Sequence, residues 1–296
     1  MEWAISLPNY SEGKHIDALT QARELACGEE VYSKGIEMEG KIEFTRLYFG
    51  QEFCERLLPT TAELSSAFMA ANQQQLEFSL VTPYVTEQGL QQVAELLCCL
   101  AQLKQDCEVV VNDWGVLHLL HSKHPQLKPV LGRMLNKVWR DPRILRNLPT
   151  DLRLFQTCSL SGKPMQALLC RYGVQRVEID YPPQGLDPEL DKWGFSISLY
   201  LPFGCITTGR MCLLGAWGLP RGEKFKTTNA TCSKACRSGH LELTDASGQI
   251  GEGDEWMIVQ WGNSVFYHLE GDQLGAALTR TRQLGVERII VQSKPL

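Results

Sequence analysis

Short apolar runs rich in β-branched and aromatic residues recur along the chain, and stretches with the apolar spacing of helices separate them. Several helical stretches end in a glycine that leads into the next apolar run, as in Tyr172-Gly173-Val174 and Leu284-Gly285-Val286. A helix closed by glycine and followed by a strand is the repeating unit of parallel sheets. Strands are predicted at Phe44–Phe49, Glu77–Thr82, Glu108–Asn112, Val130–Leu135, Arg176–Asp180, Phe195–Leu201, Glu255–Gln260 and Arg288–Val291. Helices are predicted at Thr61–Ala71, Glu87–Leu103, Gly115–Ser122, Lys163–Arg171 and Gly271–Leu284.

Six or more such units predict an α/β fold, namely a TIM-like (β/α) barrel, regular or irregular. The 296 residues suit one barrel, which typically takes about 250 residues. No low-complexity linker divides the chain, so we expect a single domain over residues 1–296. Residues 204–253 interrupt the alternation and are rich in Gly, Thr, Ser, Lys and Arg. We predict that they form a long inserted loop on the C-terminal face of the barrel, where barrel active sites lie.

The balance of charges and the length of the apolar runs limit whether the chain binds nucleic acid or a membrane. The chain has 29 Lys and Arg against 34 Asp and Glu, a formal net charge of −5, so it has no general attraction to nucleic acid or anionic membranes. Its longest apolar runs, such as Ala94–Ala101, are far shorter than the roughly 20 residues that span a bilayer. The first residues lack the basic start and apolar stretch of a signal peptide. We therefore expect a cytoplasmic protein without a membrane span.

Eleven cysteines are the most informative residues of the composition. In a reducing cytosol, so many cysteines favour metal binding or catalysis over disulfides. Thiolates select zinc or iron–sulfur clusters, and a [4Fe–4S] cluster needs four of them. The spacing within the predicted loop is C-x6-C-x19-C-x3-C, which lacks the paired C-x2-C knuckles of a zinc ribbon and therefore favours a cluster. Incidental cysteines are the alternative. The candidates are Cys205, Cys212, Cys232 and Cys236 in the loop, and Cys54 after an early predicted strand.

Three stretches, in the same order along the chain, resemble the U32 peptidase family, a group of iron–sulfur proteins. The resemblance runs along most of the chain and is nearest to the branch that serves anaerobic ubiquinone biosynthesis. Met211 departs from the family, because it separates Arg210 from Cys212 where the family has Gly-Arg-Cys unbroken. The matching stretches are Arg46–Cys54, then Val111–Leu117 followed by Gly132–Asn136, and finally Gly209–Cys212 with Cys232–Arg237.

Carried over to this sequence, the resemblance implies a [4Fe–4S] cluster with one early and three late cysteine ligands. Other branches of the family have a ligand where Cys205 stands, so Cys205 is the alternative ligand. His268 is a weaker alternative, because it follows the Asn263-Ser264 pair after which other branches have a late cysteine. The implied ligands are Cys54, Cys212, Cys232 and Cys236.

The resemblance also implies oxygen-independent hydroxylation of a quinone precursor, in a hetero-oligomer, such as a heterodimer, with a sister U32 protein. The chain would be the hydroxylase or an obligate component of a hydroxylase complex. We do not expect a protease, because the sequence has neither a Gly-x-Ser-x-Gly elbow nor a His-Glu-x-x-His pair. Two alternatives stay open. One is hydroxylation of RNA bases, which the acidic balance disfavours, and the other is a non-catalytic interaction protein stabilised by zinc.

Two further groups of residues were considered for binding. The basic stretch Arg133–Arg153 could contact an anionic substrate or acidic partner, or be a solvated basic face. Arg133 is its candidate substrate-binding residue, because it follows Gly132 on a predicted strand. Three histidines spaced three apart could share one helix face, but no carboxylate is interleaved, so a solvated helix end is the better interpretation. They are His118, His121 and His124.

Overall fold

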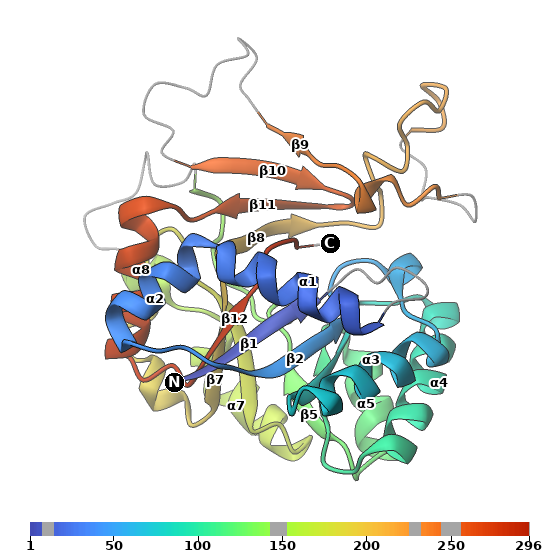
Figure 1. Ribbon diagram of the computed structural model, residues 1–296, viewed down its shortest axis with the longest axis horizontal. Helices are drawn as coiled ribbons and strands as arrows, with labels where there is room; N and C mark the ends of the chain where they lie inside the picture. Colours follow the sequence, from blue (N-terminus) through green and yellow to red (C-terminus); the bar gives the residue numbers. More distant parts are fainter. Residues whose placement is uncertain (8–14, 143–152, 225–231, 244–255, 296) are drawn as a thin grey trace.

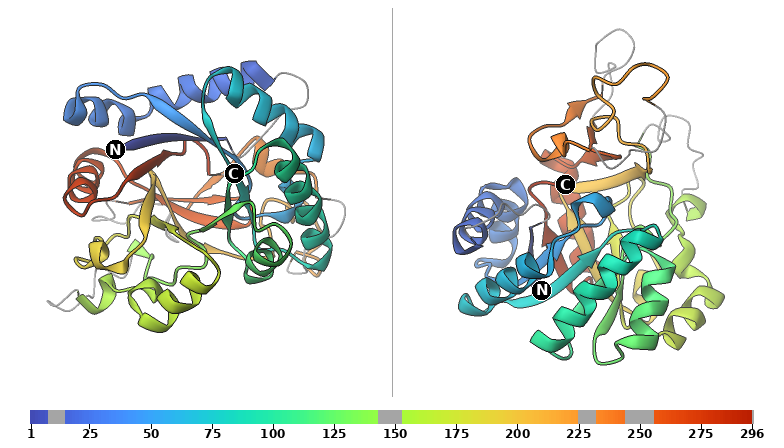
Figure 2. Two further views of the ribbon diagram at one scale, coloured as in Figure 1. Left: turned by 90° about the horizontal axis from the view of Figure 1, so that it is seen from below. Right: turned by 90° about the vertical axis from the view of Figure 1, so that its right-hand side faces the viewer.

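Eight parallel strands close into a barrel in the order β1-β12-β7-β6-β5-β4-β3-β2, and helices surround it (Figures 1 and 2). The computed structural model describes residues 1–7, 15–142, 153–224, 232–243 and 256–295. The predicted TIM-like α/β barrel is confirmed. Its strands are β1 (Glu2–Leu7), β2 (Phe44–Gly50), β3 (Glu77–Thr82), β4 (Glu108–Val111), β5 (Lys128–Leu131), β6 (Arg176–Asp180), β7 (Ser196–Leu201) and β12 (Arg288–Val291).

The barrel is irregular because its connections differ. Two helices follow β1, whereas only the short 3-10 helix Leu190–Trp193 lies between β6 and β7. The connection from β7 to β12 carries a second sheet before its helix. In the described ranges, no helix is both long enough and apolar enough to cross a membrane. The helices are α1 (His15–Gly28), α2 (Glu30–Glu39), α3 (Thr61–Gln73), α4 (Glu87–Leu103), α5 (Trp114–Lys123), α6 (Arg153–Gln156), α7 (Lys163–Arg171) and α8 (Gly271–Gln283).

The second sheet is antiparallel, has the order β8-β11-β10-β9, and lies across the end of the barrel near the C-terminus of the chain (Figure 1). It changes two expectations. Residues 204–253 were predicted as a loop, but they begin within β8 and also contain β9. The strand predicted at Glu255–Gln260 is observed at Met257–Trp261 and belongs to this sheet rather than to the barrel. Residues 225–231 and 244–255 lie outside the described residues. The strands are β8 (Phe203–Thr208), β9 (Leu241–Glu242), β10 (Met257–Trp261) and β11 (Ser264–His268).

Capping side chains mark where α3, α4 and α5, which follow barrel strands, begin. At α3, the Thr60 hydroxyl accepts a hydrogen bond from the backbone N–H of Glu63 (3.2 Å), and the Glu63 carboxylate accepts one from the backbone N–H of Thr60 (2.6 Å). This reciprocal pair is a capping box. At α5, the Asp113 carboxylate accepts from the backbone N–H of Gly115 at 2.7 Å. The Asp-x-Gly segment of the family resemblance therefore starts a helix here.

Side chains fill the interior of the barrel in layers. At the N-terminal end, the Arg288 guanidinium donates to Glu2 at 2.7 Å and to Glu108 at 2.7 and 3.1 Å. Above it, the rings of Tyr48 and Tyr200 lie edge to face at 6.2 Å. They pack with an apolar layer that shields the axis from water. The other members of that layer are Ala4, Val81, Val110, Val130 and Ile290.

The chain leaves β2 through Gly50, which has a φ of 131°. A side chain at this position would collide with the backbone carbonyl oxygen of Val81 on the neighbouring strand. Only glycine therefore allows this approach and this backbone conformation. The turn brings the following residues, which end at Cys54, to the mouth of the barrel beneath the second sheet.

Candidate metal centre

Four of the five candidate cysteines are electrostatic neighbours. Burial raises the pKa of the Cys54 thiol, and the negative charges of Cys212 and Cys232 raise it further. Burial raises the pKa of Cys236 to about 12, with contributions from Cys212, Cys54 and Cys232. Burial also raises the pKa of Cys212, and Cys232 adds to that rise. Each pair among these four thiols thus contributes to the pKa shift of at least one of its members.

The four cysteines come from separate segments at the junction of the barrel and the second sheet. Cys54 follows β2 and is the N-cap of the 3-10 helix Glu55–Leu57. Cys212 follows β8, whereas Cys232 and Cys236 precede β9. The indole N–H of Trp261 on β10 donates to the backbone carbonyl of Cys236 at 2.7 Å. An apolar cluster surrounds Cys54 and Cys236, and it includes Phe53, Phe203, Trp261 and Phe266.

Backbone N–H groups point at two of the sulfur atoms. The backbone N–H of Gly215 donates to Cys212 Sγ at 3.2 Å. Although burial raises the pKa of Cys54, hydrogen bonds from the backbone N–H groups of Arg56 and Leu57 act in the opposite direction. Donors of this kind stabilise a thiolate. Hydrogen bonds to sulfur also tune the reduction potential of iron–sulfur clusters.

Cys205 lies in different electrostatic surroundings, although it packs in the same apolar cluster. It is fully buried on β8, and its backbone N–H donates to Asp180 Oδ1 at 3.1 Å. Burial raises the pKa of its thiol to about 12, and the largest effect of a charged group comes from Asp180. The other weaker ligand candidate, His268, has its Nδ1 2.8 Å from Glu270 Oε1 and its ring against Phe203. Cys205 thus shares the apolar cluster of Cys54 and Cys236, but the charged group with the largest effect on it is Asp180, whereas His268 is paired with Glu270.

The donor set of four thiols has the chemistry of a soft metal centre. The four thiols are partly or fully buried and lie within electrostatic range of one another, and soft donors of this kind select zinc or iron–sulfur clusters. In the described part of the chain, no three His, Cys, Asp or Glu side chains are already arranged to hold a metal ion. The residues that would hold a [4Fe–4S] cluster are Cys54, Cys212, Cys232 and Cys236.

Arg133 lies at the barrel mouth, fully buried, and protein acceptors occupy its whole guanidinium group. It binds the Glu52 carboxylate through two hydrogen bonds of 3.0 and 2.7 Å, and Asp180 Oδ1 at 2.8 Å. It also donates to the Phe203 carbonyl at 3.0 Å and to the Gln292 side chain at 2.8 Å. Since a guanidinium has five N–H donors, none is left for a ligand in this arrangement. Arg133 therefore joins β5, β6, β12 and β8, and its role in substrate binding stays a prediction.

The interpretation of the basic stretch as a solvated face is wrong for Arg133 and Arg140, whereas Lys137 between them is exposed. Arg140 is buried, and its Nε lies 3.2 Å from Asp180 Oδ2. Its guanidinium also donates to the backbone carbonyls of Arg133 and Asn136. Buried carboxylates attract these arginines because each side neutralises a charge that would otherwise be costly to bury. Residues 143–152 of the stretch lie outside the described residues.

Glu178 lies beneath this network and is fully buried on β6. The hydroxyl of Tyr200 donates to its Oε2 at 2.9 Å. Burial raises the pKa of this carboxyl to about 8, the charge of Glu52 raises it further, and hydrogen bonds with Tyr200 and Tyr48 oppose the rise. Glu178 thus holds a proton at neutral pH in the folded chain, whereas the unfolded chain releases it.

This difference predicts that the stability of the metal-free protein falls as the pH rises. The protonated Glu178 carboxyl contributes its full stabilisation of the folded state below pH 4.5, the pKa of this carboxyl in the unfolded chain. That stabilisation is lost as the pH rises through about 8, its pKa in the folded chain. The slope from this group is at most about 1.4 kcal/mol per pH unit. Denaturant unfolding across this range should show a flatter profile for Glu178→Gln than for the wild type. Glu37→Gln, at an exposed position on α2, should keep the wild-type slope, and equal slopes in all three proteins would contradict the prediction.

The three histidines are placed around α5. His118 and His121 pack edge to face against Tyr172, with ring centroids 6.4 and 5.1 Å away. His124 lies at the end of the helix, with Nε2 3.9 Å from Cys98 Sγ, and burial lowers its pKa. Packing against an aromatic ring accounts for the first two.

Sequence reasoning did not identify the acidic and amide residues that surround Arg133. Glu52, Asp180 and Gln292 follow or end the strands β2, β6 and β12. Polar residues at the carboxyl ends of barrel strands gather at one face of the barrel. That position in the strand was the signal from which these residues could have been found.

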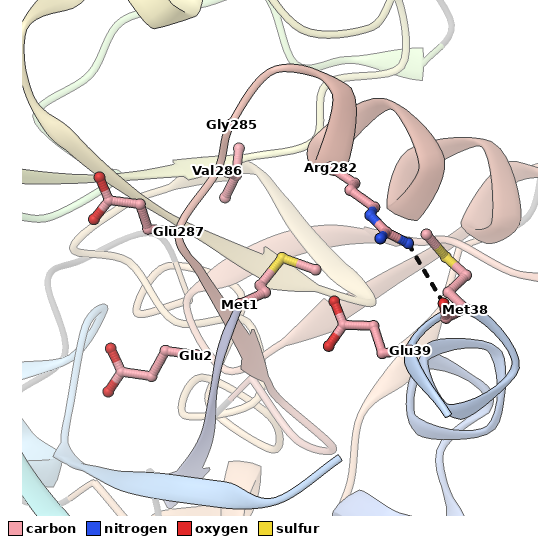
Figure 3. Close-up of a pocket in the computed structure, with 8 residues that line it drawn as sticks. All are labelled: Met1, Glu2, Met38, Glu39, Arg282, Gly285, Val286 and Glu287. Carbon is pink, nitrogen blue, oxygen red and sulfur yellow. Dashed lines mark hydrogen bonds between the residues drawn. The ribbon is translucent and has the colours of Figure 1, made fainter. Parts of the chain in front are cut away.

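A surface pocket of about 690 Å³ lies at the opposite end of the barrel. Figure 3 shows the side chains of Glu2, Glu39 and Glu287 there, with Arg282 donating to the Met38 carbonyl at 3.4 Å. Glu2 begins β1 and Glu287 precedes β12, so this is the N-terminal end of the strands. The pocket is therefore distinct from the thiol site, which lies at the end where barrel active sites are found.

No family model matches the sequence, and no curated protein matches it. The likeness to solved structures is distant. The spore cortex-lytic enzyme SleL of Bacillus cereus is 13% identical over 98% of this chain and 70% of its own chain, with a TM-score of 0.39. SleL of Bacillus megaterium QM B1551 is 10% identical over the same shares of the two chains, with a TM-score of 0.36. Likenesses this weak carry no conclusion about function.

Proposed function

We propose that this chain is a [4Fe–4S] protein of the U32 type that serves oxygen-independent hydroxylation in anaerobic ubiquinone biosynthesis. The observation that carries this proposal is that one early cysteine, Cys54, packs in the same apolar cluster as the late Cys236, with Cys212 and Cys232 within electrostatic range of both. This set is the one that the sequence resemblance to U32 proteins implies, and it is nearest to the set of the protein UbiV. The choice of Cys54 over Cys205 is supported by the different surroundings of Cys205.

The surroundings of the thiols suit a cluster that must be shielded from water and whose reduction potential must be adjusted. When bound, a [4Fe–4S] cluster would supply one-electron chemistry at a potential set by burial and by hydrogen bonds to sulfur. Phe53, Trp261 and Phe266 pack around the site and exclude water. The N–H of Gly215 donates to Cys212 Sγ, and so this chain offers both means of tuning. The substrate in this proposal is a quinone precursor, and the partner is a sister U32 protein similar to UbiU.

The first test is metal analysis of anaerobically purified protein. We expect a brown protein with about four irons per chain. A colourless protein with one zinc per chain would overturn the cluster and favour the zinc-stabilised interaction protein, because four thiolates also suit structural zinc. A protein without bound metal would overturn both.

The second test concerns the reaction. Cells grown without oxygen and lacking this chain should lose ubiquinone and accumulate a precursor that lacks a ring hydroxyl. The wild-type chain and Cys205→Ala should restore ubiquinone, whereas Cys212→Ala should not. If ubiquinone is unchanged while specific RNA bases lose their hydroxylation, the RNA alternative replaces this proposal.

A further inference from the structure

Asn263 lies in the turn between β10 and β11 and contacts the backbone of two cysteine-bearing segments. Its Nδ2 donates to the carbonyl oxygen of Phe53 at 2.7 Å and to that of Gly209 at 2.8 Å. The Phe53 carbonyl belongs to the peptide group whose nitrogen is that of Cys54, and Gly209 stands three residues before Cys212. A single side-chain amide thus joins a loop of the barrel to a segment of the second sheet.

Neighbouring groups fix the orientation of this amide. The carbonyl oxygens of Phe53 and Gly209 can only accept hydrogen bonds, so the nitrogen side of the Asn263 amide is the side that faces them. The backbone carbonyl of Asn263 accepts from the N–H of Gly209 at 3.1 Å. Asn263 is buried, with 9% of its surface exposed. Burial leaves water little room to replace these contacts, so the NH₂ group of the amide stays directed at the two carbonyls.

A tyrosine completes the connection. The Tyr84 hydroxyl accepts from Asn263 Nδ2 at 2.9 Å and donates to the Gly209 carbonyl at 2.6 Å. The two carbonyl oxygens are both acceptors and would repel each other without donors between them. Asparagine supplies two N–H donors for three acceptors at this point, so one N–H is shared between two of them. Aspartate, which has nearly the same shape, would present an acceptor instead.

We propose that Asn263 is a positioning residue that holds Cys54 and Cys212 at one centre, with Tyr84 as its second member. This inference rests on the proposed function for the binding of a cluster at the centre. The hydrogen bonds that join the two segments are present in the metal-free chain. Asn263 does not touch the cluster ligands' sulfur atoms in this role. It determines how far apart the two ligand-bearing segments lie.

The test compares Asn263→Asp with Asn72→Asp, which makes the same chemical change at an exposed position on α3. Anaerobically reconstituted proteins are mixed with an iron chelator, and the loss of visible absorption is followed. We expect Asn263→Asp to lose iron about 10-fold faster or more, as is typical when groups that orient metal ligands are replaced. Tyr84→Phe should accelerate the loss by a smaller factor. A rate for Asn263→Asp equal to that of Asn72→Asp would overturn the proposal.

A second readout uses metal-free protein and separates this inference from the proposed function. In a chain with Cys232→Ser and Cys236→Ser, a trivalent arsenical that bridges two close thiols should capture Cys54 with Cys212, as located by mass spectrometry. Asn263→Asp should lower the capture rate several-fold, and Asn72→Asp should not. If the wild type binds no iron but this result holds, the proposed function fails and the positioning role stands. If Asn263→Asp does not fold, Tyr84→Phe is measured in its place, and a capture rate equal to that of the parent would overturn the role.

Discussion

Replacing Cys54 with alanine should remove most of the iron from anaerobically prepared protein, whereas replacing Cys205 with alanine should leave the iron content near the wild-type value. A [4Fe–4S] cluster needs about four thiolates, one for each iron. The Cys54 thiol interacts with those of Cys212 and Cys232, whereas the largest effect of a charged group on Cys205 comes from Asp180. The measurement is iron and sulfide per chain, with the visible spectrum of each variant.

The matched control is Cys170→Ala, because Cys170 is exposed on α7 and lies far from these contacts in the fold. Cys205→Ala leaves a small cavity in a fully buried position, so its unfolding midpoint is measured beside its iron content. If Cys205→Ala loses its iron and Cys54→Ala keeps it, Cys205 is the fourth ligand, and the assignment of Cys54 is wrong.

Replacing Arg133 with methionine should destabilise the protein by about 3–5 kcal/mol, which is typical for breaking a buried ion pair from one side. The substitution keeps an unbranched side chain but leaves the carboxylates of Glu52 and Asp180 without the cation that now lies 2.7 and 2.8 Å away. It also removes the donor to the Phe203 carbonyl, which joins β8 to the barrel. Chemical denaturation of the metal-free protein gives the free energy of unfolding.

Two further variants separate the charge from the packing. Arg133→Met combined with Glu52→Gln and Asp180→Asn should recover part of the loss, because the stranded carboxylates are neutralised. Arg171→Met, at an exposed arginine at the end of α7, should change stability by less than about 0.5 kcal/mol. A loss below about 1 kcal/mol for Arg133→Met alone would show that the buried network contributes little.

The Arg133 network and the Asn263 contacts support the thiol site from two directions. Glu52 lies two residues before Cys54 and is held by Arg133, while the carbonyl of Phe53 is held by Asn263. Two contacts therefore fix the loop just before Cys54, one at the side chain of Glu52 and one at the backbone carbonyl of Phe53. Well-supported ligand segments of this kind lower the cost of organising a metal centre.

Local sequence signals were sufficient for most barrel strands and for the helices between them. The bounds of β3, β6, β12, α4 and α7 were predicted without error. The strand predicted at Val130–Leu135 was misplaced and is observed at Lys128–Leu131, because the chain leaves the sheet at Gly132 so that Arg133 can turn into the barrel mouth. The strands β1, β8, β9 and β11 and the helices α1, α2 and α6 were missed. Short apolar segments near a terminus or among glycines, such as these strands, carry little periodicity.

By itself, the sequence determined the barrel, through the alternation of β-branched runs with helices closed by glycine, and it singled out five cysteines by type and spacing. Only the tertiary structure decided which of them are neighbours, because Cys54 and Cys236 approach each other through the closure of the barrel and the second sheet laid across it. The partners of Arg133 were beyond sequence reasoning for the same reason. Glu52, Asp180 and Gln292 are distant along the chain, and burial makes their charges and dipoles interact strongly only after the strand ends have been brought together.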